Sequence, residues 1–441
     1  MQTTIPSYQT NTVSEYSKKS PFSAELMQHI RDSFYYVDHC PYAGKRIFFE
    51  NAGGSLTLKS VVQKTTVISC IPDNEHRNNP ASKELSRIVA KGKDDIKIFF
   101  GASDGIIFGG ETGTECLFRL IRSATLAAPK GSSILSSSVE HPATYSATQY
   151  WANRMNIAWL EVPFQHDTGM VRPEDYESIV RPNTRVTTII HTSPVTGMTM
   201  DIKAIAKVIR NIAPKCLIIV DGIQHAQHGY LDVPDYGIDA YVISLYKSFA
   251  KFNNGYAWVS DRMSSVPHEH LIGKSDHEWE LGSRDPSALA AASEVSRYLC
   301  WLGSHFTDSV EKRPKLVAAG NAIKMHEECL VQHLLYGDES RKGLCDYQTI
   351  EIVGGENNKA REGVVSFSVK GIDAKTIVSE FGDRNIRIHA RSNDVFSGNI
   401  LNPLNLESVS RISLAHYNTN EEVNYFLEQL EKILQYKCEP Y

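Results

Sequence analysis

Two apolar runs of the sequence each end in a side chain that can do chemistry. The run "LIIV" leads directly into Asp221, and "AYVISLY" leads directly into Lys247. Burying either charge is costly unless the group is paired, neutralised or used in a reaction. We therefore expect Asp221 and Lys247 to belong to a reactive site at the ends of two buried strands.

The types of these two residues match what pyridoxal phosphate requires of a protein. A lysine forms the Schiff base with the cofactor, and an acid keeps the pyridine nitrogen protonated so that the ring draws electrons from the substrate. The segment "FGGETGTECLF" opens a helix at Gly113 and Thr114, where backbone N–H groups suit a phosphate. His141 follows the strand-like run "SSILSSS" and offers a flat ring to stack on the cofactor.

Each of these residues also has an ordinary interpretation. The lysine can lie at the end of a strand with its amine in solvent. The acid and the Gly-Thr pair can cap helices, and the histidine can lie in a surface turn. Only the combination favours a cofactor site. The pair His225 and His228 suggests a metal, but no third ligand follows at a fitting spacing, so we expect no metal site.

For these residues to form one site, the chain must place them at the ends of strands in one sheet. Short apolar runs alternate with amphipathic stretches such as "DIKAIAKVIRNIA" up to about residue 300. This alternation is typical of an α/β fold with a mainly parallel sheet, which binds ligands beyond the carboxyl ends of its strands. After about residue 305, a long helical segment is followed by "GVVSFSV" and "VSRISLAHY". We predict an N-terminal arm and helix over residues 1–45 that pack with the small domain, a large cofactor-binding domain over 46–305 and a smaller α+β domain over 306–441.

Composition excludes several other classes of protein. The net charge is −5, so no basic excess indicates a nucleic-acid or membrane-surface partner. No apolar run reaches the length of a membrane span, and the polar N-terminus lacks the core of a signal peptide. The eight cysteines include no CxxC pair. We expect reduced thiols and a cytoplasmic enzyme.

The order of these motifs resembles the class V aminotransferase-fold family of fold type I, in its cysteine desulfurase-like and isopenicillin N epimerase-like branch. The resemblance runs from "FFENAGGS" to "RISLAHYNTNEEV". It implies a homodimer with a shared active site, pyridoxal phosphate as cofactor and an amino-acid substrate. It assigns the Schiff base to Lys247, the pyridine-nitrogen acid to Asp221, ring stacking to His141 and a ring-oxygen contact to Gln224. It assigns phosphate contacts to Gly113, Thr114 and Ser244, a phosphate contact across the subunit interface to Ser283, and the substrate carboxylate to Arg411.

Three positions depart from the family's pattern. Tyr246 replaces the histidine before the lysine, and a tyrosine there can still bind the phosphate. Pro194 replaces an asparagine that contacts the ring oxygen, which leaves that contact to Gln224 or to a neighbour such as Thr196. The segment "IRIHARSNDVFSGN" lacks the mobile cysteine that relays sulfur in desulfurases.

These departures shape the expected reaction. The segment without the cysteine offers His389 and Arg391 as substrate contacts, and Asn51 in "ENAGG" is a further candidate. After the substrate amine displaces Lys247 from the cofactor, this lysine is expected to take the α-proton, which leaves a carbanion or quinonoid. We expect a lyase acting by β- or γ-elimination, or an enzyme of specialised metabolism that forms carbon–carbon bonds.

Other outcomes of the same chemistry stay open. They are a cysteine desulfurase, an aminotransferase or an amino-acid epimerase. A vestigial fold used only for binding would have lost the lysine, the acid or the phosphate ligands, and all are present. A dinucleotide-binding protein would need a G-x-G-x-x-G turn after its first strand, which "FENAGGS" does not supply.

Overall fold

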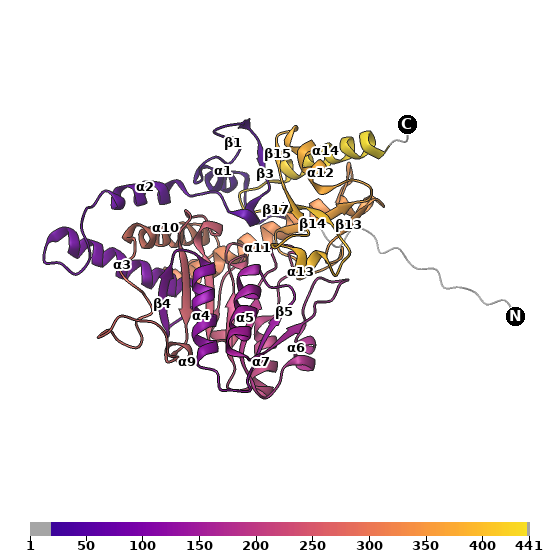
Figure 1. Ribbon diagram of the computed structural model, residues 1–441. Coiled ribbons are helices and arrows are strands. Elements are labelled where there is room, and N and C mark those ends of the chain that lie inside the picture. The colour runs from indigo at the N-terminus through magenta and orange to yellow at the C-terminus, as the bar shows by residue number, and fades with distance from the viewer. Residues whose placement is uncertain (1–18, 439–441) are drawn as a thin grey trace.

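A seven-stranded sheet forms the centre of the larger part of the fold (Figure 1). The computed structural model describes residues 19–438. Across the sheet the strands are β4 (Ile106–Gly110), β10 (Gly255–Val259), β9 (Ala240–Ser244), β8 (Leu217–Asp221), β7 (Thr184–Ile190), β5 (Ser133–Ser137) and β6 (Ala158–Val162). Only β10 runs antiparallel to its neighbours. The predicted α/β fold with a mainly parallel sheet is therefore confirmed.

The central strands are apolar on both faces because both faces are covered. Ile219 and Val242 pack on one side, against the helix α4 (Gly113–Leu126). Ile218, Val220 and Tyr241 belong to the core on the opposite side. Side chains alternate between the two faces along a strand, so a strand covered twice reads as a continuous apolar run.

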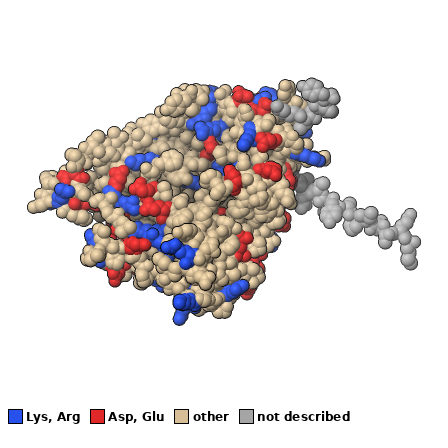
Figure 2. Space-filling view, in the orientation of Figure 1, with Lys and Arg blue, Asp and Glu red and all other residues tan. Residues whose placement is uncertain are grey.

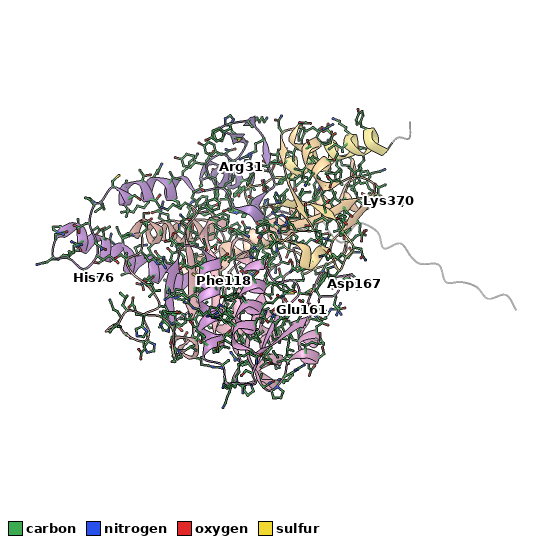
Figure 3. The ribbon with its side chains drawn as sticks, viewed as in Figure 1. Arg31, His76, Phe118, Glu161, Asp167 and Lys370 are labelled. Atoms are coloured by element: carbon green, nitrogen blue, oxygen red, sulfur yellow. The ribbon has the colours of Figure 1, made fainter. Side chains whose placement is uncertain are left out.

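Helices cover the sheet in sequence order. After α4 come α5 (Pro142–Met155), α6 (Pro173–Ile179), α7 (Ile202–Ile212) and the short α8 (Val233–Tyr236) and α9 (Asp261–Ser264). Phe118 on α4 and Glu161 on β6 are labelled in Figure 3, and the hydroxyl of Tyr145 on α5 donates to the Glu161 carboxylate. The amphipathic stretch "DIKAIAKVIRNIA" contains the helix α7. Its first residue, Asp201, caps the helix, which begins at Ile202.

A layer of longer helices joins the sheet to the rest of the chain. It contains α2 (Lys59–Ser69), α3 (Pro80–Phe99), α10 (Pro286–Gly303) and α11 (Lys312–Tyr336). Gly92 lets α3 approach α10 closely, since a Cβ there would lie 2.6 Å from the Cβ of Leu289. The helix predicted near residues 311–334 is α11.

A smaller antiparallel sheet follows in the order β13 (Ile350–Ile352), β14 (Val364–Val369), β17 (Ser408–Ser413) and β16 (His389–Ser392). It packs with α12 (Ala374–Gly382) and α14 (Asn420–Cys438). The early strand β3 (Ile47–Phe48) pairs in parallel with β15 (Ile386–Arg387), so a segment near the start of the chain joins this C-terminal part. The helix α1 (Ala24–Asp32) precedes it.

Short elements complete the described chain. They are β1 (His39–Cys40), β2 (Gly44–Lys45), β11 (Gly337–Asp338), β12 (Arg341–Lys342), α13 (Gly398–Leu401) and the 3-10 turns Asn51–Gly53, His225–Gln227, Leu245–Lys247 and Leu344–Asp346. Most of the predicted N-terminal arm, residues 1–18, lies outside the described part. The domain boundaries at 45 and 305 stay predictions.

The surface carries both signs of charge. Figure 2 shows lysine and arginine side chains interspersed with aspartate and glutamate over the visible face. Among the described helices, none combines the length and apolar character that crossing a membrane would require.

Candidate active site

Two adjoining cavities meet at Lys247. The first, of about 190 Å³, lies at the carboxyl ends of β8 and β9 and at the start of α4. It is lined by Thr112, Thr114, His141, Ile190, Pro194, Asp221, Ile223, Gln224, Ser244, Tyr246, Lys247 and Phe252. The second, also about 190 Å³, is lined by Glu50, Ala52, Gly53, His141, Pro194, Tyr246, Lys247, His389, Arg391 and Arg411. One cavity therefore collects the expected cofactor residues, and the other collects the expected substrate residues.

Lys247 is buried and ends the 3-10 turn that follows β9. Its Nζ donates a hydrogen bond to Oε1 of Gln224 at 3.1 Å. Burial, together with the charges of Arg411 and Arg391, lowers the pKa of Lys247 to about 7, although Asp221 opposes them. Near neutral pH a large share of this lysine is a free amine, which is the form that attacks a carbonyl group.

Asp221 is the last residue of β8 and is fully buried. Its Oδ1 accepts a hydrogen bond from the backbone N–H of Ile223 at 3.1 Å. Burial raises the pKa of Asp221 to about 6, although that N–H and the charge of Lys247 favour the ionised form. A protonated ring nitrogen in this cavity would find a carboxylate poised to pair with it.

The start of α4 meets the end of β9 at a point where no side chain fits. The backbone N–H of Gly113 donates to Oγ of Ser244 at 3.0 Å. A Cβ on Gly113 would lie 2.5 Å from that oxygen and from Cδ1 of Ile223. Thr112 caps the helix by accepting from the N–H of Glu115, and Thr114 lines the cavity. This arrangement presents a helix N-terminus and hydroxyl groups to an anion.

His141 lines both cavities and is the N-cap of α5, where its Nδ1 accepts from the N–H of Ala143 at 3.2 Å. Burial, with Lys247 and Arg391 nearby, lowers the pKa of His141 to about 3. The ring is therefore neutral at physiological pH and suited to stacking. Tyr246 also lines both cavities, and its ring stacks on Phe252 with centroids 4.5 Å apart.

Two guanidinium groups reach the second cavity from neighbouring strands. Arg411 on β17 is buried and donates to the carbonyl of Pro194 at 2.9 Å. Arg391 on β16 donates to the carbonyl of Phe396 at 2.8 Å. Burial lowers the pKa of Arg411 to about 9, and Arg391 adds to this effect. Within the described chain, the Nε atoms of both arginines are buried without a hydrogen-bond partner. Both Nε–H groups can therefore donate to an anionic ligand.

His389 and Glu50 form the outer wall of the second cavity. Nδ1 of His389 lies 3.1 Å from Oε1 of Glu50. Arg387 pairs with the other carboxylate oxygen of Glu50 at 2.5 Å. Burial favours the neutral form of Glu50, but His389 and Arg387 more than offset it, so the pKa of Glu50 is lowered. An ionised carboxylate and two arginines therefore line the same cavity.

Two predicted site residues lie elsewhere. The sequence predicts that Asn51 approaches the substrate, but its amide donates to the carbonyl of Ser413 at 2.8 Å and accepts from the hydroxyl of Tyr417. Asn51 lines neither cavity and anchors a turn instead. Ser283 is exposed, and its hydroxyl accepts from the amide of Asn74 at 3.3 Å. Within one subunit it does not reach the first cavity, so its contact across an interface stays a prediction.

Pro194 stands at the position of the missing asparagine, and its only hydrogen-bonding group is its backbone carbonyl. Pro194 lines both cavities, and its carbonyl is held by Arg411. The alternative donor Thr196 bonds to the carbonyl of Gly169 and to the N–H of Met198, and it lines neither cavity. Gln224 is therefore the side-chain amide available in the first cavity.

The expected absence of a metal site at His225 and His228 stays a prediction. Nδ1 of His225 lies 2.7 Å from Glu362, and Nδ1 of His228 lies 2.6 Å from Glu327. No group of three suitable ligands occurs among residues 19–438. Each histidine is instead paired with one buried carboxylate.

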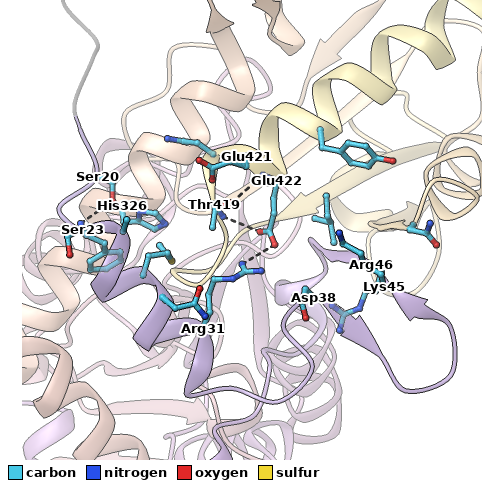
Figure 4. Close-up of a pocket in the computed structure, with 18 of the residues that line it drawn as sticks. Ser20, Ser23, Arg31, Asp38, Lys45, Arg46, His326, Thr419, Glu421 and Glu422 are labelled. Atoms are coloured by element: carbon cyan, nitrogen blue, oxygen red, sulfur yellow. Dashed lines mark hydrogen bonds and ion pairs between the residues drawn. The ribbon is translucent and has the colours of Figure 1, made fainter.

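A larger cavity, of about 740 Å³, lies elsewhere (Figure 4). It is bounded by α1, the start of α14 and residues near β2 and β3. Its charged groups largely neutralise one another, as in the ion pair between Arg31 and Glu422 at 3.0 Å. None of the predicted catalytic residues lines it.

Comparison with known proteins identifies the family. The model of the family "Aminotransferase class-V" matches residues 47–275 and 316–426. The chain belongs to the class V aminotransferase family. The match spans both cavities, including Asp221, Lys247 and Arg411.

Relatives and solved structures agree with this assignment. The aminotransferase-like protein FGM3 of Gibberella zeae is 27% identical over 406 residues, which cover 88% of this chain and 95% of that protein. The cysteine desulfurase-like protein ustD of Aspergillus flavus is 27% identical over 411 residues, covering 89% and 88%. An apo cysteine desulfurase of Thermococcus onnurineus NA1 has a similar fold, with a TM-score of 0.78, 18% identity and coverage of 95% and 99%.

Enzymes of the class V aminotransferase family use pyridoxal phosphate, and this chain is an enzyme of that kind. The first cavity fits the cofactor on its own evidence. A lysine with a lowered pKa faces a buried acid, and a helix N-terminus without a side chain at Gly113 adjoins them.

Sequence reasoning missed several residues that line the site, and three of them are polar or aromatic. Thr112, Phe252 and Glu50 all line a cavity. Thr112 had a local signal, because a threonine three residues before a glutamate is typical of a helix start. Glu50 and Phe252 had none, since they come close to the site only through tertiary packing.

Proposed function

We propose that Lys247 binds pyridoxal phosphate covalently and that the enzyme acts on an α-amino acid, or on a molecule bearing one, as a lyase or a carbon–carbon bond-forming enzyme. One observation carries this proposal: Lys247 lies where the cavity with Asp221 and the cavity with Arg391 and Arg411 meet. A substrate held by its carboxylate in the second cavity would place its amine beside Lys247.

The bound cofactor supplies an electron sink for a bond at the substrate's α-carbon. Asp221 would pair with its ring nitrogen, and His141 would stack on the ring as a neutral aromatic group. Gly113, Thr114 and Ser244 at the start of α4 would hold its phosphate, and Tyr246 lines the same cavity.

Lys247 has a second task once the substrate's amine has displaced it. Its lowered pKa lets the free amine accept a proton from the α-carbon near neutral pH. Gln224, 3.1 Å away, fixes the position of Nζ. The burial of this pair keeps water away from the proton that Lys247 holds.

Arg411 and Arg391 bind the carboxylate of the substrate. A planar guanidinium can bind a carboxylate through two parallel hydrogen bonds, and each arginine has a buried Nε without a partner in the described chain. His389 and Glu50 line the same cavity and contribute to the choice of substrate side chain.

The absence of a cysteine at the site favours a lyase or a bond-forming enzyme over a sulfur-relaying desulfurase. No cysteine among the described residues lines either cavity. In the segment "IRIHARSNDVFSGN", Phe396 bonds through its carbonyl to Arg391. A cysteine desulfurase is the second candidate, supported by the names of several relatives.

Absorbance spectroscopy tests the proposal. The purified protein should show the visible band of a lysine-linked cofactor, and Lys247→Ala should lose it. Lys251→Ala is the matched control, because Lys251 bonds to Ser287 at 3.0 Å and lines neither cavity of the site. A band that survives Lys247→Ala would refute the assignment.

The substrate class is tested with a panel of amino acids that includes cysteine and others with β- or γ-leaving groups. A shift of the band, with release of the leaving group, would identify a lyase. Stoichiometric conversion of cysteine to alanine, with the sulfur released as sulfide by an added thiol reductant, would favour the desulfurase instead.

A further inference from the structure

A buried chain of hydrogen bonds runs from Lys247 away from the cavities. Nζ of Lys247 donates to Oε1 of Gln224 at 3.1 Å, and Nε2 of Gln224 lies 3.1 Å from Nε2 of His228. Nδ1 of His228 then lies 2.6 Å from Oε2 of Glu327 on α11. All four residues are buried. The mechanism above uses Lys247 and Gln224 but gives no task to His228 or Glu327.

The chemistry of each group fixes the direction of this chain. An ionised carboxylate can only accept, so Nδ1 of His228 carries the proton that is shared with Glu327. Nε2 of His228 is then free to accept, and it receives the amide N–H of Gln224. The amide has one donor end and one acceptor end, so its oxygen must face Lys247.

The histidine and the glutamate occupy the space that a side chain at position 363 would fill. A Cβ on Gly363 would lie 2.9 Å from Oε2 of Glu327 and 3.2 Å from Cε1 of His228. Within the described chain, Oε1 of Glu327 is buried without a hydrogen-bond partner. The pairing with His228 is thus the contact that holds this carboxylate.

Several charged or titratable groups surround His228. Glu327 on α11, Glu362 before β14 and Lys247 all act on its charge, and His225 and His416 lie near it. Burial opposes protonation of His228, but the two carboxylates more than offset it, so the pKa of His228 is raised. A second proton on this ring is therefore accessible.

We propose that Glu327 and His228 are positioning residues that determine which end of the Gln224 amide faces Lys247 and the cofactor cavity. When His228 carries one proton, at Nδ1, Gln224 presents its oxygen to Lys247. When His228 carries two protons, its Nε2–H needs an acceptor, so the amide turns and presents its N–H. The inference rests on the proposed cofactor site, because the turned amide acts on the lysine-linked nitrogen and the ring oxygen.

The two orientations have opposite effects on Lys247. An amide oxygen accepts from a protonated nitrogen and stabilises it, whereas an amide N–H destabilises it and favours the neutral form. The same N–H would donate to an anionic ring oxygen. The proton on His228 and the loss of a proton from Lys247 are thus linked through one amide.

Glu327→Gln tests the inference because it should reverse the direction of the hydrogen bonds from residue 327 through His228 to Gln224. The shape of the side chain hardly changes. The new amide can donate to Nδ1 of His228, which moves the histidine proton to Nε2 and turns Gln224. In the holoenzyme, the pH titration of the lysine-linked cofactor band should shift its midpoint downward by about one unit, as expected when one buried hydrogen bond changes sign. In the Gln224→Met background, the same substitution should produce no shift.

Glu362→Gln is the matched control. Glu362 is also buried and paired with a histidine, His225 at 2.7 Å, but that histidine has no hydrogen bond to Gln224. Because Glu362 also raises the pKa of His228, this control is read from the tautomer: His228 should stay protonated at Nδ1 in Glu362→Gln. His228→Gln gives a second route if Glu327→Gln does not fold, because its side chain cannot be protonated, and it should also move the midpoint.

A second readout does not need the cofactor. NMR of histidine-labelled, cofactor-free protein should show His228 protonated at Nδ1 in the wild type and at Nε2 in Glu327→Gln. An unchanged tautomer together with an unchanged midpoint in folded variants would overturn the inference. If the wild type forms no lysine-linked band, the proposed function fails. The tautomer of His228 alone then decides whether Glu327 sets the direction of the hydrogen bonds to Gln224.

Discussion

The burial of the Arg411 charge lowers the stability of the fold, and Arg411→Met should make this cost measurable. The arginine is fully buried, and no carboxylate of the described residues forms an ion pair with it. Burial and the charge of Arg391 lower the pKa of Arg411 to about 9, whereas an exposed arginine stays above about 12. This difference corresponds to about 4–5 kcal/mol, at about 1.4 kcal/mol for each pKa unit.

Methionine has a similar length and carries no charge. The variant loses the hydrogen bond to Pro194, which is worth about 1–1.5 kcal/mol. The free energy of unfolding of the cofactor-free protein should therefore rise by about 2–4 kcal/mol, within the range seen when buried charges are replaced by apolar residues. The value of kcat/KM should fall about 10- to 100-fold, because a charge-assisted carboxylate contact is lost.

Urea unfolding at one fixed protein concentration measures the first quantity, and steady-state kinetics measures the second. Arg387→Met is the matched control, since Arg387 lies on β15, is largely exposed and pairs with Glu50. Its removal should change the free energy of unfolding by less than about 1 kcal/mol. An Arg411→Met protein that is less stable than the wild type, or that keeps the wild-type KM, would refute the reasoning.

Three further predictions follow from other parts of the site. The pKa of Lys247 is lowered to about 7, so attachment of the cofactor to the apoprotein should accelerate as pH rises, with a midpoint near 7. Since the unfolded chain keeps this proton up to about pH 10, the apoprotein should also gain stability between about pH 7 and pH 10, and a midpoint for attachment near 10 would contradict both points. Gly113→Ala should weaken cofactor binding by about tenfold or more, because its Cβ would collide with Ser244, whereas Gly382→Ala meets no atom within 4 Å and should bind normally in an equilibrium titration. If Ser283 completes the site of a partner subunit, the active species should sediment as a dimer, and an active monomer would remove that role.

The sheet and the centre of the site could be predicted from sequence because their signals are local. The strands β8 and β9 are buried on both faces, so they appear as unbroken apolar runs that end at Asp221 and near Lys247. The helix start at Gly113 is marked by glycine and threonine. Such features depend on neighbours in the chain, which the sequence displays directly.

The second cavity could be predicted only in part, because distant segments build it. Asn51 is a polar residue after a strand, which suggests a substrate contact, but its amide is used by Ser413, 362 residues away. Glu50 is likewise drawn into the cavity wall by Arg387 and His389. No local sequence pattern indicates a contact between residues so far apart in the chain.

The pairing of β3 with β15 also sets an order for synthesis. Every strand of the seven-stranded sheet lies between residues 106 and 259, so that sheet can form before the C-terminal third of the chain leaves the ribosome. The turn at Asn51 must wait for Ser413 and Tyr417, which are made after every strand of that sheet. The nascent chain therefore carries the completed seven-stranded sheet while β3 still lacks its partner strand. The second cavity, which residues far apart in the polypeptide line, forms after the sheet that carries Asp221.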